Sequence, residues 1–157
     1  WIGVSPLQDD PEDGLDETAF DIVSAEYRVD GTQVELKLES STIVNPSTAF
    51  IEAWGQSGGA GYAYFRWVVQ SGVGTLQGYI SGVGFQPLGT LTVSYPDDHH
   101  VVMSFDSTDL DLATDQFNIG FAAGWCGPPT YYCDQFPDNW GYPYVSFSTG
   151  QWFTVEW

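Results

Sequence analysis

The stretch VSAEYRVDGTQVELKLES, residues 23–40, decides the fold class of this chain. Apolar and polar side chains alternate in both halves of it, and a period of two residues is typical of a strand with one buried face. Asp30-Gly31 lies between the halves, and both residue types tolerate the positive φ of a tight hairpin turn. The stretch therefore predicts an antiparallel β-hairpin. Its inward-facing residues are predicted to be Val23, Ala25, Tyr27, Val29, Val34, Leu36 and Leu38.

Similar short runs, separated by Gly, Pro and Asn turn signals, fill the rest of the chain. They predict further strands at about 48–54, 61–69, 74–80, 89–95, 100–105, 117–123, 143–148 and 151–156. The run at 61–69 is apolar on both faces apart from Arg66, so we expect it at the centre of a sheet. The one helical candidate is a short turn at 107–113, with Asp106 or Ser107 as its cap.

About ten short strands without long helices indicate an all-β fold. We expect an antiparallel β-sandwich of the jelly-roll or immunoglobulin-like kind, formed as one domain by residues 1–157. Tyr62, Tyr64 and Trp67 fall in the central run and are expected in its core.

The charge balance is unusual because basic residues are nearly absent. Arg28, Lys37 and Arg66 stand against 21 acidic residues, which gives a net charge of −18. Such a surface repels nucleic acid and anionic lipid, and it attracts metal cations. Arg28 and Lys37 fall on the outward face of the predicted hairpin. We expect them to pair across strands with Glu26, Glu35 or Glu39.

Two groups of aspartates are candidate calcium ligands. Calcium takes six to eight oxygens, which carboxylates and carbonyls of acidic loops supply. The alternative interpretation is a set of solvated acidic loops, and the register of an EF-hand is missing. His99 and His100 are adjacent, so on a strand they would point to opposite faces and do not suggest a transition-metal site. The candidate ligands are Asp9, Asp10, Asp13, Asp16 and Asp21 in the first group, and Asp106, Asp109 and Asp111 in the second.

Cys126 and Cys133 bracket the sequence GPPTYY, a spacing that allows a local disulfide. Two free thiols are the alternative. A disulfide would argue for an extracellular location. The chain has no stretch of 18 apolar residues, so we expect no membrane span.

The segment GWCGPPTYYCDQFPDNWGYPY, residues 124–144, concentrates aromatic residues among Gly and Pro. Exposed aromatic rings stack on sugars or anchor protein–protein contacts, and the alternative is a second small core under a long loop. The candidate ligand-binding or interface aromatics are Trp125, Tyr131, Tyr132, Trp140 and Tyr142.

Nothing in the sequence indicates catalysis. A G-x-S-x-G elbow, a P-loop and a dinucleotide fingerprint are all missing from it. We therefore expect a protein that is not an enzyme.

Several short motifs resemble one β-sandwich superfamily. DPED at 10–13, FDIVSA at 20–25 and the Asp30-Gly31 hairpin resemble the opening of DOMON and family 9-like carbohydrate-binding domains. The stretch from Leu110 through 117–119 and the segment 133–138 are similar to that family's closing strands. The resemblance implies secretion, a jelly-roll-like sandwich, frequent calcium, and binding rather than catalysis. Met103 lies close to both histidines in sequence, which argues against the haem ligation of some members.

Apolar, β-prone segments stand at both ends of the sequence, WIGV at 1–4 and WFTVEW at 152–157. Residues 1–8 are expected to form either an edge strand of their own sandwich or a donor strand inserted into a neighbouring copy. The sequence thus favours a secreted, non-catalytic structural subunit of a filament, tubule or surface layer, self-associating through strand addition and aromatic contacts, with calcium as a stabilising ion. The alternative is a secreted carbohydrate-binding module with a glycan as its ligand. Because −18 charges per copy would oppose assembly, we expect it to depend on cations or pH.

Overall fold

The hairpin predicted from residues 23–40 forms strands β2 (Ile22–Asp30) and β3 (Gln33–Ser40). Gly31 in the turn has a φ of 62°, which is the conformation that the turn signal requires. One detail of the prediction is wrong. A β-bulge between Ile22 and Ser24 shifts the alternation, so that Ile22 is fully buried and Val23 is only half-buried.

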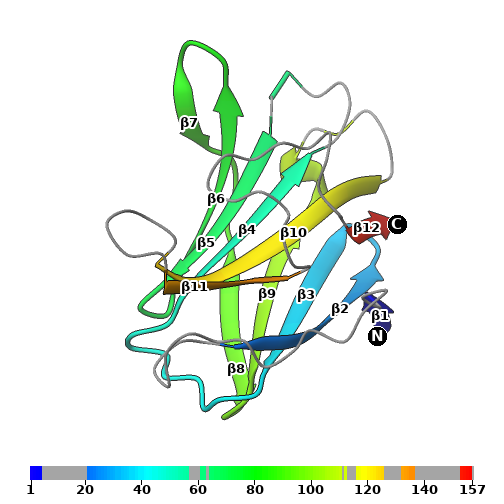
Figure 1. Cartoon of the computed structure of the whole chain (residues 1–157). Coiled ribbons are helices and arrows are strands. Elements are labelled where there is room, and N and C mark those ends of the chain that lie inside the picture. The colour runs from blue at the N-terminus through cyan, green and yellow to red at the C-terminus, as the bar shows by residue number, and fades with distance from the viewer. Residues whose placement is uncertain are drawn as a thin grey trace.

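Two antiparallel sheets pack face to face as a sandwich (Figure 1), which confirms the predicted all-β fold. The structure is a computed structural model and describes residues 1–4, 21–56, 61–62, 64–110, 112, 116–125, 132–136 and 153–156. Within these residues the first sheet has five strands. In spatial order they are β1 (Ile2–Val4), β2, β3, β9 (His100–Asp106) and β8 (Thr92–Asp97).

The second sheet of the described residues has seven strands. Its order is β11 (Tyr132–Phe136), β10 (Gln116–Trp125), β4 (Phe50–Gln56), β5 (Tyr64–Gln70), β6 (Val73–Ile80) and β7 (Gly84–Pro87), with β12 (Phe153–Glu156) also paired to β10. The central position expected for the run at 61–69 is confirmed by β5. The chain crosses from the first sheet to the second twice, from β3 to β4 and from β9 to β10. Strands β3 and β9 are neighbours in the first sheet, and β4 and β10 are neighbours in the second.

Most predicted strands are present within two or three residues of their expected bounds. The short strands β7 and β11 were not predicted, and the predicted strand at 143–148 lies outside the described residues. The helical turn is a 3-10 helix, η1 (Ser107–Leu110). In the described part of the chain no helix has the length and apolar character needed to cross a membrane.

Aromatic rings from both sheets meet in the core. Trp67 on β5 is fully buried, and its ring centroid lies 5.4 Å from that of Phe105 on β9 and 5.4 Å from that of Phe117 on β10. Phe65, also on β5, lies 6.2 Å from Trp67. Rings of this size exclude a large apolar area from water. The contact between Trp67 and Phe105 therefore joins one sheet to the other.

Replacing Trp67 with Ala should destabilise the fold by about 3–5 kcal/mol, because it leaves a large cavity between the sheets. Val73→Ala is the matched control, since Val73 is 65% exposed and its loss should change the free energy of unfolding by less than about 0.5 kcal/mol. Chemical denaturation measures both values. Equal effects at the two positions would contradict this assignment of the core.

Candidate functional site

The outer face of the five-stranded sheet carries two cross-strand ion pairs. Arg28 pairs with Glu35 and Lys37 pairs with Glu26, and each pair joins residues directly opposite in the register of β2 and β3. This confirms the predicted pairing of the hairpin's two cations. The hydrogen bond to Glu35 raises the pKa of Arg28 above its ordinary value. The two side chains are therefore held in place by neighbours on the sheet itself.

Trp1 lies over both cations. The Arg28 guanidinium carbon and the Lys37 ammonium nitrogen are each 4.6 Å from the centre of a Trp1 ring. Both distances are within the range of a cation–π interaction, for which Trp is the best aromatic partner. The Trp1 side chain nevertheless stays 46% exposed. The sequence did not predict this contact, because no short-range pattern links Trp1 to β2 and β3.

A groove of about 400 Å³ lies beside this cluster on the same face. His100 and Asp97 form one side of it, with the His100 Nδ1 atom 2.7 Å from a carboxylate oxygen of Asp97. The backbone N–H of His99 and the side chain of His100 both donate to Asp97 and lower its pKa. Among the described residues, no cysteine lines the groove. Its lining residues are Trp1, Arg28, Glu35, Lys37, Ser94, Pro96, Asp97, His100 and Val102.

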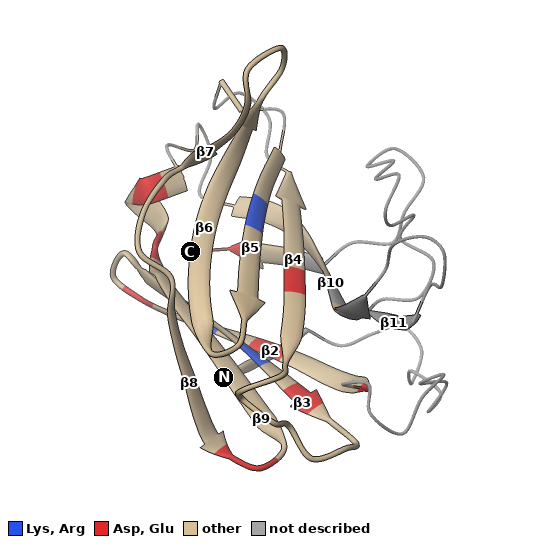
Figure 2. Cartoon of the chain, turned by 90° about the vertical axis from the view of Figure 1, so that its left-hand side faces the viewer, with Lys and Arg blue, Asp and Glu red and all other residues tan. Residues whose placement is uncertain are grey.

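The third cation lies on the outer face of the other sheet. Figure 2 shows a basic position in blue on β5 and an acidic position in red on the adjacent β4. Arg66 on β5 pairs with Glu52 on β4, and the Glu52 side chain is only 1% exposed. The indole N–H of Trp54 donates to the same carboxylate at 3.3 Å. The Arg66 guanidinium carbon lies 5.2 Å from the Trp54 ring and 5.3 Å from the Phe85 ring. Arg66 and the Trp54 N–H are thus among the groups that stabilise the buried Glu52 charge.

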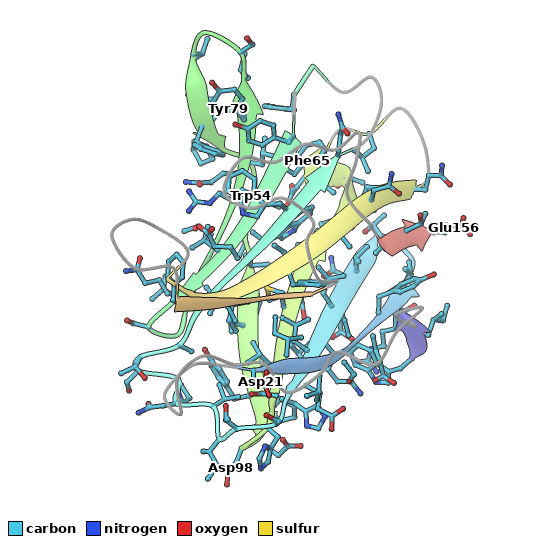
Figure 3. All side chains as sticks on the ribbon, viewed as in Figure 1. Asp21, Trp54, Phe65, Tyr79, Asp98 and Glu156 are labelled. Atoms are coloured by element: carbon cyan, nitrogen blue, oxygen red, sulfur yellow. The ribbon has the colours of Figure 1, made fainter. Side chains whose placement is uncertain are left out.

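Four aromatic side chains gather around this ion pair. Tyr64 and Tyr79 stack with ring centroids 4.6 Å apart, and both rings contact Phe85. Phe85 lies opposite Tyr79, which Figure 3 labels, one residue pair away from the pair that closes the β6–β7 turn. The expectation that Tyr64 belongs to the core is therefore wrong, while Trp67 is confirmed as a core residue. Tyr64 is two positions from the outward-facing Arg66, and this alternation is the signal that could have placed it on the outer face.

Asp21 is the one member of the first acidic group that the structure describes. It lies near Asp98 at one end of the sandwich (Figure 3), where residues 41–44 connect the two: the N–H of Ser41 donates to the Asp21 carbonyl at 2.9 Å, and the N–H of Val44 donates to the Asp98 carbonyl at 2.7 Å. The Asp21 side chain is 5% exposed. Its Oδ2 atom accepts the Ser41 hydroxyl, and its Oδ1 atom has no donor among the described residues. Asp9, Asp10, Asp13 and Asp16 lie outside the described residues.

The second acidic group is used for local structure. Asp106 Oδ1 accepts the backbone N–H and the hydroxyl of Thr108, at 2.9 and 2.6 Å, and so caps η1 as predicted. Its Oδ2 accepts the Thr32 hydroxyl at 2.9 Å and the Gln33 amide at 3.2 Å. These donors lower the pKa of Asp106. Asp109 packs against Gly89, and Asp111 lies outside the described residues. No group of three potential metal ligands occurs in the part of the chain that is described.

The prediction for the aromatic segment, residues 124–144, is partly wrong. Trp125 and Tyr132 were predicted in a loop, but their backbones pair at the end of the β10–β11 ladder, next to the pair of Gly124 with Cys133. Aromatic residues have high β-propensity, which explains why strand continues into a Gly- and Pro-rich stretch. The predicted disulfide partner Cys126 and the candidate aromatics Tyr131, Trp140 and Tyr142 lie outside the described residues.

Comparison of the chain with protein-family models, with curated proteins and with solved structures found no match.

Replacing Asp106 with Asn should lower the unfolding temperature near pH 7 by a few degrees, because an amide loses one of the two acceptors that four donors share. The pKa of Asp106 is lowered in the folded state, so its contribution is complete above its usual value near 3.8 and is lost as the pH falls through the folded-state pKa. The difference between parent and variant should therefore shrink toward pH 3. Thermal unfolding from pH 3 to 7 checks this, and a difference that stays constant with pH would contradict it.

Proposed function

We propose that this chain is a secreted structural subunit of an extracellular assembly, in which β1 of one copy pairs with β2 of the next. One observation carries the proposal. Among the described residues, strand β1 belongs to its own sheet through three residue pairs, Ile2 with Tyr27, Gly3 with Glu26 and Val4 with Ala25. Ile2 is 57% exposed and Trp1 is 46% exposed. Trp1 and Ile2 thus leave about half of their surface exposed.

Exchange of this strand between copies would need no new contacts. The same three residue pairs form whether β1 comes from its own chain or from a neighbour, as in domain swapping. Residues 5–20 connect β1 to β2, and a fully extended chain reaches about 3.3–3.6 Å per residue, which allows a separation on the order of 50 Å. Each copy would both give and receive a strand. Where a copy gives its strand to one neighbour and receives a strand from another, the contact is head-to-tail and extends into a polymer.

Two other sheet edges are less suited than β2 to receive a strand. Strand β8 ends the first sheet on its far side and contains both a register shift and Pro96, and β7 ends the second sheet after four residues at Pro87. Proline and bulges hinder the addition of a further strand. Strand β2 has nine residues, of which only Ala25–Tyr27 pair with β1. Within the described residues, β2 therefore offers the longest receiving edge.

We include calcium in the proposal because assembly brings negatively charged copies into contact. Copies with a charge of −18 repel one another unless cations or protons neutralise part of it. The buried Oδ1 atom of Asp21, without a donor among the described residues, is a group that a bound cation would stabilise. We therefore propose calcium near Asp21, and a requirement for cations or low pH in assembly.

Electron microscopy of the concentrated protein should show regular polymers, and a double variant tests how they form. In Gly3→Cys with Glu26→Cys, the two thiols lie on directly opposed residues, so oxidation at low concentration locks β1 in its own chain. The oxidised variant should stay monomeric, and reduction should restore polymers.

The control mixes the two single variants, Gly3→Cys and Glu26→Cys, under oxidising conditions. Strand exchange predicts disulfides that join different chains at the two introduced cysteines, identified by mass spectrometry. Polymers that form equally well from the locked monomer would reject strand exchange.

Chelation of calcium should lower the unfolding temperature by several degrees, since an ion bound only to the folded state stabilises it. The Asp21→Asn variant should respond less to the chelator than the parent, whereas Asp109→Asn should respond as the parent does. Calorimetry with and without chelator measures this. An unchanged unfolding temperature of the parent would exclude a stabilising calcium ion.

A further inference from the structure

Two of the three cations of the chain contact a single aromatic residue. Arg28 and Lys37 are diagonal neighbours on β2 and β3, and the Trp1 ring lies 4.6 Å from each. We call Arg28 and Lys37 the indole clamp. The remaining cation, Arg66, lies on the opposite sheet between Trp54 and Phe85 and is paired with a buried carboxylate. Within the described residues, Arg28 and Lys37 are therefore the one pair of cations in contact with an exposed tryptophan.

The clamp does not depend on β1 for its shape. Glu35 and Glu26 hold the two cations through cross-strand ion pairs within the β2–β3 hairpin. Val102 of β9 lies beside Lys37 in the register, and the Ser104 hydroxyl donates to Glu35 at 3.4 Å. If β1 leaves its own sheet, the clamp remains organised and open toward the groove. A preorganised site loses little conformational entropy when it binds again.

Trp1 also contributes something that the three backbone pairs of β1 cannot. Backbone hydrogen bonds of a strand carry no sequence information, and a slip of two residues along β2 would keep both the hydrogen-bond pattern and the faces of the side chains. A ring that must lie over the clamp fixes the register of Ile2 opposite Tyr27 and the antiparallel direction. It also selects the edge of β2 over any other edge of the sandwich.

We infer that Trp1 is the recognition residue of strand exchange, and that the indole clamp of the receiving copy is the site that binds it. The partner is a second copy of this chain, and the ligand group is its indole. This inference rests on the proposed function, because it names the residues that decide where an exchanged strand binds.

The experiment measures the critical concentration for polymer formation by sedimentation. The donor variant is Trp1→Leu, which keeps an apolar residue but removes the π face. The clamp variant is Arg28→Gln with Lys37→Gln. The closed monomer makes the same contact between Trp1 and the clamp as the polymer does. Each variant alone loses this contact in both states, so each should assemble close to the critical concentration of the parent.

Two controls separate recognition from charge and from folding. Gln56→Glu with Gln70→Glu makes the net charge of −18 more negative by two units, as the clamp variant does, but at exposed positions on the other sheet. Mixed with the donor variant, this control should show no gain in association, because it keeps its own clamp and already makes the contact in its closed monomer. Denaturation midpoints of all variants establish that the sandwich remains folded.

Mixing the donor and clamp variants gives the decisive result. The clamp variant still has Trp1, and the donor variant still has its clamp, so one of the two possible junctions between them is intact. That junction makes the contact between Trp1 and the clamp, which neither variant makes in its own closed monomer. Two exposed cation–π contacts correspond to a factor on the order of ten, so we expect heterodimers at about a tenfold lower concentration than either variant needs alone. A parent that polymerises, together with no gain in association when the two variants are mixed, would overturn the inference but leave the proposed function standing. A parent that stays monomeric would overturn both.

Discussion

The packing of Trp67 against Phe105 and Phe117 is the interaction on which the rest of this structure depends. It joins β5 of one sheet to β9 of the other, and the surrounding core is almost wholly apolar. A chain with three basic residues cannot hold two sheets together by ion pairs. The exclusion of aromatic surface from water holds the two sheets together instead, and this stabilisation does not depend on the charge of the surface. The carboxylates are therefore free to serve other purposes, such as capping η1.

Each of the three cations has the same pair of neighbours, a glutamate on the adjacent strand and an aromatic ring. Arg28 and Lys37 have this environment on the first sheet, where Trp1 is the ring, and Arg66 has it on the second sheet. The two environments differ in burial. Glu52 is almost fully buried beside Arg66, whereas Trp1 remains about half exposed over its cations. On the first sheet the ring is the exposed part of the cluster, and in the proposed strand exchange it is the part that moves between copies.

The sequence was sufficient to predict the sandwich, the central strand and the two ion pairs of the hairpin, because each follows from alternation within a few residues. The bulge at Ile22 escaped prediction, since one extra residue changes the face of its neighbours without changing composition. Strand β11 escaped because Gly and Pro suggested a loop, although its aromatic residues favour a strand. The contact of Trp1 with Arg28 and Lys37 joins residues distant in sequence, and only the pairing of β1 with β2 brings them together.

A weakly held first strand and a strong negative charge act against each other in this account. The strand allows copies to join, and the charge keeps them apart until cations or protons reduce it. The central claim is that β1 acts between copies rather than within one. Light scattering of a chain that lacks residues 1–4 tests it most directly, with calcium present and across protein concentrations at which the full chain assembles. The account predicts a folded monomer under every condition, and polymers of the shortened chain like those of the full chain would contradict it.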